Sequence, residues 1–253
     1  MDKQNRFNPL DLTNRKILVT GASSGIGRAT SIYLSKLGAK LVLIARNEER
    51  LNNTLKKLDG ENHISILADL AELEDMSSIF DKAVEDGIKL NGLVHCAGIP
   101  YVMPIKNLTR KRLLEAFNIN YFAFMELTRQ YSKNKYSDGG SIVGISSIAA
   151  ERPAQCQTAY SAAKAAIDIS AQALSLELIK KGIRINTVLP GMIDTEIIEK
   201  SDDIGADLES LGKGQIMGIG QPDDVASVIA FLISDMSRFI TGRRFFIDGG
   251  CFL

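Results

Sequence analysis

The chain has 253 residues, of which 45% are hydrophobic and 24% are charged, so it is long enough to bury the core of one α/β domain. Its formal net charge is zero and its pI is about 6.7, which argues against a nucleic-acid or anionic-membrane binding protein. Apolar runs are only strand-sized and the N-terminal segment is polar, so we expect a cytoplasmic protein with no membrane segment.

Short apolar segments alternate with longer amphipathic ones along the chain. We expect strands near 16–20, 40–45, 63–67, 92–96, 141–146, 183–189 and 243–247. We expect helices near 25–37, 47–58, 72–85, 109–134, 158–181 and 222–234. The strands are continuously apolar, which is typical of strands covered on both faces. The pattern predicts a single Rossmann-like α/β domain over residues 1–253, with a doubly wound parallel sheet of about seven strands and helices on both faces.

A glycine-rich turn, Thr20-Gly21-Ala22-Ser23-Ser24-Gly25-Ile26-Gly27-Arg28, joins the first strand to the first helix. Gly21 permits the tight turn, Gly25 lets the backbone approach a pyrophosphate, and Gly27 lets the helix pack on the sheet. The free amides of the helix N-terminus face the anion. We therefore expect a dinucleotide site that includes Gly21, Ser23, Ser24, Gly25, Ile26 and Gly27. An ordinary glycine turn is the alternative.

The second strand ends at Arg46, where NAD enzymes usually carry a carboxylate for the adenosine ribose. A guanidinium group suits a 2′-phosphate instead, with assistance from Ser23 or Arg50, so we expect NADP(H) as the cofactor. A solvated surface arginine is the alternative. After the third strand, Asp69 is expected either to accept a hydrogen bond from the adenine amino group or to cap a helix that starts near residue 72.

The fourth strand is followed by His95 and Cys96. We expect His95 to be a buried structural histidine and Cys96 to be a small buried residue rather than a reactive thiol. The chain has three widely spaced cysteines and two histidines, so we expect neither a disulfide framework nor a metal site.

Tyr160 and Lys164 are four residues apart in the expected helix 158–181, so their side chains share one face. An ammonium group favours the ionised phenol and lowers a pKa that is about 10 in the free side chain, which suits proton exchange with a carbonyl compound. Tyr131 and Lys135 have the same spacing, but they lie in a polar stretch before a Gly-Gly pair and lack an upstream serine. We expect Tyr131 and Lys135 to be surface residues.

Together these segments resemble the short-chain dehydrogenase/reductase family over Thr20–Gly250. The resemblance also rests on Asn118-Ile119-Asn120, Asn186-Thr187-Val188-Leu189-Pro190-Gly191, Ile240-Thr241-Gly242 and Asp248-Gly249-Gly250. It selects Ser147 over Ser146, because the family serine lies thirteen residues before its tyrosine, and it selects Asn120 over Asn118. Cys96-Ala97-Gly98 departs from the family's Asn-Ala-Gly, and we expect a modest effect on stability.

The resemblance implies a division of roles among the catalytic residues. Tyr160 would be the general acid in reduction, and Ser147 would donate a hydrogen bond to the substrate oxygen. Lys164 would bind the nicotinamide ribose and lower the pKa of Tyr160, while Asn120 would hold a water molecule of a proton relay. Hydride would pass directly between nicotinamide and the carbonyl carbon. Further implied cofactor contacts are Leu70, Ala97, Gly98, Pro190, Gly191, Ile193 and Thr195, with Thr195 near the carboxamide.

Residues 191–220 form the long irregular stretch of the chain and are the expected substrate lid. Its charged residues are Asp194, Glu196, Glu199, Asp202, Asp203, Asp207 and Glu209 against Lys200 and Lys213. This excess of carboxylates would repel an acidic carrier protein or a polyanionic thioester, although a solvated charged loop explains it equally well.

Two substrate hypotheses for NADP(H)-dependent carbonyl reduction therefore stay open. One is a thioester-linked substrate, as in the 3-oxoacyl-acyl-carrier-protein reductases. The other is a neutral keto-sugar, a steroid-like ketone or another small carbonyl compound. A nucleotide-binding sensor without turnover is a remote alternative, since both Tyr160 and Lys164 are present.

The expected helix 158–181 carries a stripe of small residues, Ala162, Ala166 and Ala173, with Ile169 between them. Such a stripe allows a second helix to approach closely, and the family commonly forms dimers or tetramers through this region. We expect a homodimer or homotetramer, with inward packing of the stripe as the alternative. We expect no nucleic-acid or membrane partner.

Overall fold

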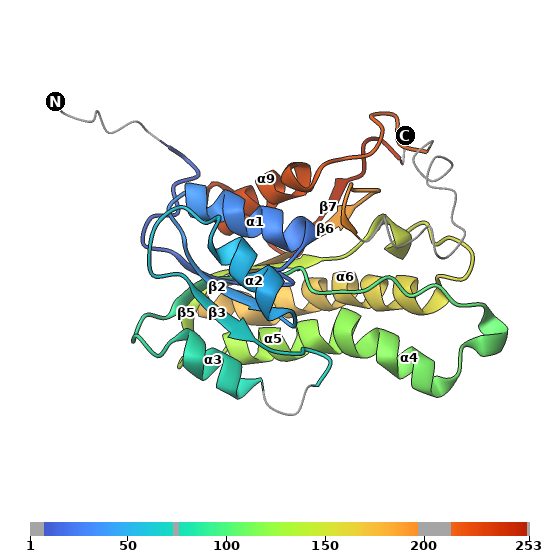
Figure 1. The fold of residues 1–253 in the computed structure, drawn as a ribbon, viewed down its shortest axis with the longest axis horizontal. Helices are drawn as coiled ribbons and strands as arrows, with labels where there is room; N and C mark the ends of the chain where they lie inside the picture. The colour runs from blue at the N-terminus through green and yellow to red at the C-terminus, as the bar shows by residue number, and fades with distance from the viewer. Residues whose placement is uncertain (1–7, 73–75, 197–213, 252–253) are drawn as a thin grey trace.

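The computed structural model describes residues 8–72, 76–196 and 214–251. They contain a seven-stranded parallel sheet in the order β3-β2-β1-β4-β5-β6-β7, which lies between two layers of helices (Figure 1). The strands are β1 (Lys16–Thr20), β2 (Lys40–Ala45), β3 (Ile64–Leu67), β4 (Leu90–His95), β5 (Ser137–Ile145), β6 (Ile183–Pro190) and β7 (Arg244–Ile247). The helices are α1 (Gly25–Lys36), α2 (Glu48–Leu55), α3 (Ser77–Ala83), α4 (Arg110–Phe117), α5 (Ala123–Tyr131), α6 (Thr158–Leu178) and α9 (Pro222–Ile233). The predicted doubly wound α/β architecture is confirmed.

Alternate residues of each central strand enter two separate hydrophobic cores. In β1, Leu18 packs into the core that contains Phe124 of α5. Its neighbour Ile17 packs into the other core, with Leu34 of α1 and Ile229 of α9. Each strand is therefore apolar at successive positions because helices cover both of its faces. None of the described helices is both long and apolar enough to cross a membrane.

The helix predicted over residues 109–134 keeps its direction but changes its hydrogen bonding. A π-helical turn, Asn118–Phe122, separates α4 from α5, and the Ala123 N–H donates to the Asn118 carbonyl five residues back. Such turns often mark functional sites, because the extra residue alters which side chains face the neighbouring elements. This one contains Asn120.

Tyr131 is fully buried, so the prediction that it is a surface residue is wrong. Its phenol donates a hydrogen bond to the Gly139 carbonyl at 2.9 Å, and burial raises its pKa. The Gly139-Gly140 pair is part of β5 rather than a turn, and it brings the start of this strand over the end of α5. Lys135 is exposed as predicted and forms an ion pair with Asp81 at 2.5 Å.

Candidate active site

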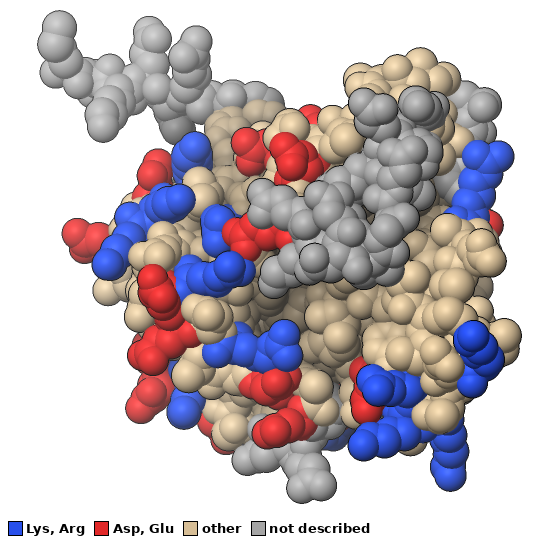
Figure 2. All heavy atoms as spheres, turned by 45° about the vertical axis from the view of Figure 1, so that its right-hand side comes forward, with Lys and Arg blue, Asp and Glu red and all other residues tan. Residues whose placement is uncertain are grey.

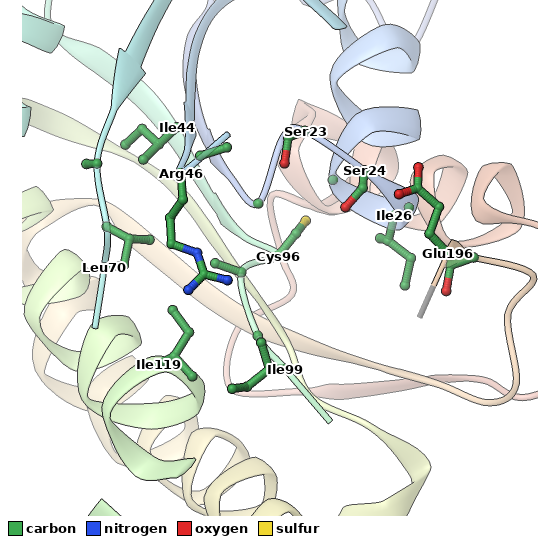
Figure 3. A pocket seen from close by; sticks show the side chains of 18 residues that line it. Ser23, Ser24, Ile26, Ile44, Arg46, Leu70, Cys96, Ile99, Ile119 and Glu196 are labelled. Atoms are coloured by element: carbon green, nitrogen blue, oxygen red, sulfur yellow. The ribbon is translucent and has the colours of Figure 1, made fainter. Parts of the chain in front are cut away.

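The carboxyl ends of β1, β2 and β4 and the start of α1 enclose a pocket (Figure 3). Eleven predicted cofactor residues line it: Gly21, Ser23, Ser24, Gly25, Ile26, Gly27, Arg46, Leu70, Ala97, Gly98 and Thr195. Gly27 is required for this geometry, because a Cβ atom there would collide with the Gly21 carbonyl. In doubly wound folds, nucleotides bind in the crevice beyond the carboxyl ends of the strands. The open helix N-terminus beside this glycine cradle fits the pyrophosphate of a dinucleotide.

The structure adds seven lining residues that the sequence analysis did not assign to the cofactor site: Ile44, Ala45, Ala68, Cys96, Ile99, Ile119 and Glu196. Ala45 is the last residue of β2 and Ala68 directly follows β3. Because nucleotides bind at the carboxyl ends of parallel strands, both residues could have been predicted from the sequence as pocket residues. Ile119 reaches the pocket because of the π-helical turn, which the sequence pattern did not reveal.

Arg46 extends into the pocket beside Leu70 (Figure 3), and its side chain is 60% exposed. Its closest acidic neighbour is Asp69, with 3.5 Å between Nη1 and Oδ2. An exposed contact of this length is weak, so the guanidinium group is free to meet an incoming anion. Asp69 also accepts from the Ala71 N–H at 2.9 Å, which forms a local turn. The first described helix after β3 is α3, which begins at Ser77, and residues 73–75 lie outside the described residues, so helix capping by Asp69 near residue 72 stays a prediction.

Glu196 bridges two arginines at the edge of the pocket. Its carboxylate lies 3.2 Å from Arg28 of α1 and 2.6 Å from Arg50 of α2. In the sequence, Glu196 belongs to the excess of carboxylates in the expected lid, whereas the structure shows that its charge is paired with two arginines. The ion pairs also connect the segment after β6 to both helices that flank the glycine turn.

The expected lid is described only at its two ends, where the segments pair with each other. Ile193 forms a β-bridge with Gly220, and the Asp194 N–H donates to the Gly220 carbonyl at 2.8 Å. Buried Gln215, which the sequence did not single out, accepts from the Met192 N–H. The central part of the lid, with Glu199, Lys200, Asp202, Asp203, Asp207, Glu209 and Lys213, lies outside the described residues.

Thr195 is the part of this segment that reaches the pocket. A Cβ atom on Gly25 would lie 3.2 Å from the Thr195 methyl group, so the two residues are in close contact across the glycine turn. Pro190, Gly191 and Ile193 do not line the described pocket. Pro190 is the last residue of β6, and Gly191 and Ile193 lie between this strand and Thr195.

Ser147, Tyr160 and Lys164 come together where β5 ends and α6 begins. Burial raises the pKa of the Tyr160 phenol, while its hydrogen bond with the Ser147 side chain acts in the opposite direction. The Lys164 amine lies 5.7 Å from the centre of the Tyr160 ring and donates to the Ile145 carbonyl at 2.8 Å. Burial outweighs the hydrogen bond with Ser147, so the structure gives a raised pKa for Tyr160 where the sequence analysis expected a lowered one.

Lys164 is itself buried, and this burial lowers the pKa of its amine to about 8. Gly98 allows the lysine to approach the cofactor pocket, because a Cβ atom on Gly98 would lie 3.1 Å from the Lys164 Nζ atom. Ser147, Tyr160 and Lys164 do not line the pocket of the glycine turn themselves, but Lys164 lies directly behind Gly98 in its wall.

Asn120 is fully buried and joins the loop after β4 to the π-helical turn. Its amide nitrogen donates to the carbonyl groups of Ile99 and Ala116 at 3.1 and 3.0 Å, and its Oδ1 atom accepts from the Ile99 N–H at 3.1 Å. Both amide hydrogens are thus used by the backbone. A water molecule held by Asn120, as expected from the sequence, would have to bond to one of its oxygen atoms.

His95 and Cys96 have the predicted inert character. His95 is fully buried, with 3.0 Å between its Nδ1 atom and the Thr20 hydroxyl, and burial lowers its pKa to about 3. Burial also raises the pKa of the Cys96 thiol to about 12, so the thiolate is disfavoured. The Thr20 hydroxyl accepts from the Ala97 N–H at 3.1 Å and so holds the turn that contains Cys96. All three cysteines are free.

Comparison with known proteins agrees with this geometry. The sequence profile of a family described as enoyl-(acyl carrier protein) reductase matches residues 21–251. The chain is 34% identical to the 3-oxoacyl-[acyl-carrier-protein] reductase of Rickettsia conorii, over 95% of this chain and 98% of the relative. It is 32% identical to the L-xylulose reductase of Caenorhabditis elegans, over 95% and 96% of the two chains.

Solved structures also superimpose on the whole chain. A dehydrogenase/reductase from Sinorhizobium meliloti has a TM-score of 0.90 and 31% identity, covering 97% of this chain and 98% of its own. An actinorhodin polyketide ketoreductase crystallised with NADPH has a TM-score of 0.88 and 27% identity, covering 94% and 97%.

Proposed function

Because this chain belongs to the short-chain dehydrogenase/reductase family, a family of oxidoreductases, we propose that it uses NADP(H) to interconvert a ketone and a secondary alcohol. The observation that carries the proposal is the convergence of Ser147, Tyr160 and Lys164 beside a glycine-turn pocket that also contains Arg46. When bound, the nicotinamide cofactor supplies or accepts hydride at the carbonyl carbon.

In the reducing direction, Tyr160 donates its phenolic proton to the substrate oxygen. Burial favours the protonated phenol, so this proton is in place before the reaction. Ser147 donates a hydrogen bond to the same oxygen and orients it. Lys164, next to Gly98 at the pocket wall, holds the nicotinamide ribose, and its ammonium group stabilises the phenolate that forms after proton transfer.

Arg46 is the residue that we assign to the 2′-phosphate of NADP(H). It follows β2, lines the pocket and has one weak acidic contact that an anion can replace. Arg50 lies one turn further along the same region and its charge is shared with Glu196. The test is the ratio of kcat/KM for NADPH over NADH, and a protein that prefers NADH would refute the assignment.

For the substrate, we propose a 3-oxoacyl thioester. A basic segment supports this choice: Lys106 lies in the loop before α4, Arg110, Lys111 and Arg112 form the start of α4, and all four are exposed. The loop that leads to them is attached beside the start of α6, since the Met103 N–H donates to the Cys156 carbonyl at 2.7 Å. Figure 2 shows lysine and arginine side chains gathered at the lower right of the face onto which the central hollow opens. Positive charge at this place favours a substrate that carries phosphates.

A neutral keto-sugar or other small carbonyl is the second candidate, and the likeness to L-xylulose reductase supports it. Oxidation of NADPH with a 3-oxoacyl-CoA, a neutral β-keto ester and a ketopentose separates the two. Lys111→Glu should raise KM for the thioester and leave the keto ester unaffected. Lys180→Glu, an exposed lysine at the end of α6, is the control. Faster turnover of the ketopentose than of the thioester would refute our choice.

We also propose a cytoplasmic homodimer or homotetramer that forms through α6. Ile169 is 62% exposed on this helix, and Ala162 and Ala173 are exposed beside it, so the stripe does not pack inward within the subunit. Ile169→Glu should lower the molar mass measured by light scattering. A wild-type protein that is monomeric in this measurement would contradict the proposal.

A further inference from the structure

A buried carboxyl group lies behind the catalytic residues. Asp168 is 1% exposed and follows Lys164 by four residues on α6. Its Oδ2 atom is 2.9 Å from the hydroxyl of Ser146, and the same hydroxyl is 3.1 Å from the main-chain carbonyl oxygen of Lys164. Ser146 is also buried. One serine hydroxyl therefore lies between two oxygen atoms in a site closed to solvent.

The number of hydrogens decides the protonation state of this cluster. A serine hydroxyl has one hydrogen, whereas a carbonyl oxygen and an ionised carboxylate have none. If Asp168 were ionised, the single hydrogen of the Ser146 hydroxyl could bond to only one of the two oxygen atoms. The other contact would then bring two acceptor oxygens together with no hydrogen between them. The Lys164 carbonyl keeps its partner within α6, but Oδ1 of Asp168 has no hydrogen-bond partner among the described residues, and an unpaired buried oxygen of an ionised carboxylate is costly. A protonated Asp168 satisfies both contacts, since it donates to Ser146 and Ser146 donates to the Lys164 carbonyl.

We propose that Asp168 is a positioning residue that acts as a neutral carboxylic acid, holding the first turns of α6 against the end of β5 through Ser146. Ser147 follows Ser146 directly, and Tyr160 and Lys164 lie on the turns of α6 that this chain of hydrogen bonds secures. The chain thereby sets the distance between Ser147 and the other two reacting side chains. The inference rests on the proposed function for these three residues.

The groups that surround Asp168 are consistent with a neutral acid. Burial is the largest influence on its pKa and raises it above the ordinary value, while the neighbouring hydroxyl groups of Thr187 in β6 and of Ser146 oppose this. Arg244 of β7 acts to lower the pKa and Glu151 to raise it, and these two side chains form an ion pair with each other. Their effects on the pKa of Asp168 are therefore opposite in sign.

The cation on the same helix is Lys164. Its amine donates to the Ile145 carbonyl and packs near the Tyr160 ring, so its hydrogen bond to the protein is made away from the carboxyl group. Among the described residues, Lys164 and Asp168 share no hydrogen bond or ion pair, and a charge on Asp168 would act on the amine only through space, where it would oppose the lowering of the Lys164 pKa by burial.

Infrared spectroscopy of the whole protein tests the protonation state directly. The other acidic side chains are ionised at neutral pH when they are exposed, so a difference spectrum between wild type and Asp168→Asn isolates one group. We expect the absorption of a protonated carboxyl group at neutral pH. Ser146→Ala should shift this absorption, because the carboxyl group loses its hydrogen-bond acceptor, and this variant serves if Asp168→Asn does not fold. Absence of a protonated-carboxyl band in wild type would overturn the proposal.

Rescue by a conservative variant tests the positioning role. An asparagine can donate to Ser146 as a protonated Asp168 does, whereas alanine cannot. Asp168→Ala should lower kcat by about ten- to a hundred-fold, and Asp168→Asn only by a few-fold with the pH profile of wild type. Glu177→Gln, an exposed position of the same helix, is the control. Equal losses in the two variants with a shifted pH profile would show that Asp168 acts as a charge, and would refute the neutral acid.

Thermal unfolding gives a readout that does not depend on turnover. A raised pKa in the folded state stabilises the protein below the unfolded pKa, and this contribution is lost as the pH rises through the folded pKa. The unfolding temperature of Asp168→Asn minus that of wild type should therefore increase as the pH rises from acid to neutral. A constant or falling difference would contradict the proposal. If no carbonyl compound is reduced but the infrared and unfolding results hold, the proposed function fails and the neutral acid stands.

Discussion

Replacing Asn120 by alanine should destabilise the fold as well as the site. The side chain is fully buried and makes three hydrogen bonds to the backbone, two as donor and one as acceptor. A typical intramolecular hydrogen bond contributes about 1 kcal/mol net, so the loss should be about 3 kcal/mol. The unpaired groups of Ile99 and Ala116 would lie where water has poor access, which places the loss toward the upper end of the usual range for point mutations.

The assay is urea unfolding of the wild type and the variant, followed by circular dichroism. Asn118→Ala is the matched control, because Asn118 lies in the same π-helical turn and is only half-buried. Its effect should be within about 0.5 kcal/mol. The comparison also tests the choice of Asn120 over Asn118 as the functional asparagine.

Turnover should fall in Asn120→Ala even under conditions where the protein is fully folded. Asn120 bonds to both the N–H and the carbonyl group of Ile99. Gly98, the residue before Ile99, lines the cofactor pocket. Loss of these bonds frees the loop after β4 to move away from Lys164. A destabilisation below about 1 kcal/mol, or an equal one in Asn118→Ala, would refute the structural role that we assign to Asn120.

Three further predictions concern the reacting groups. Tyr160→Phe should keep NADPH binding and lower kcat by about 10²–10⁴-fold, because the proton donor is lost. Tyr131→Phe should leave kcat unchanged and lower the free energy of unfolding by about 1 kcal/mol, because the hydrogen bond to the Gly139 carbonyl is lost. If Tyr131→Phe damaged turnover more, our choice between the two Tyr-Lys pairs would be wrong. Arg46→Asp should invert the ratio of kcat/KM for NADPH over NADH, since a carboxylate repels the 2′-phosphate and accepts from ribose hydroxyls; an unchanged ratio would make Arg46 a surface charge. The contribution of Lys164 to stability should rise between pH 8 and 10.5, because the unfolded lysine still binds its proton in this range while the buried amine, with a pKa of about 8, has released it; the raised pKa of Cys96 acts in the opposite direction, so the quantity to measure is the difference between wild type and Lys164→Met. Lys164→Met should remove about 3 kcal/mol of this rise in urea unfolding across the range, and an identical slope in both proteins would show that the amine is not buried in solution.

The order of strands and helices was readable from the sequence because each central strand is apolar at successive positions and each covering helix is amphipathic. The glycine turn could be placed for the same reason: Gly27 has no room for a side chain behind Gly21, so the constraint is local and leaves a mark in the sequence. The spacing of Tyr160 and Lys164 likewise follows from the period of one helix.

Contacts between distant segments were not readable in this way. Tyr131 looked exposed among polar neighbours, and it is buried because α5 ends beneath the first residues of β5. The pairing of Glu196 with Arg28 and Arg50 depends on how the segment after β6 returns to α1 and α2.

The amino-acid sequence by itself thus determined the fold class and the chemical groups of the site, because these depend on the periodicity and spacing of residues close in the chain. Only the tertiary structure decided the environment of each group: the burial that raises the pKa of Tyr160 and lowers that of Lys164, and the hydrogen bonds that join Ser146 to Asp168. The physical reason is that desolvation and hydrogen bonding depend on every atom that packs around a group, and most of those atoms come from other parts of the chain.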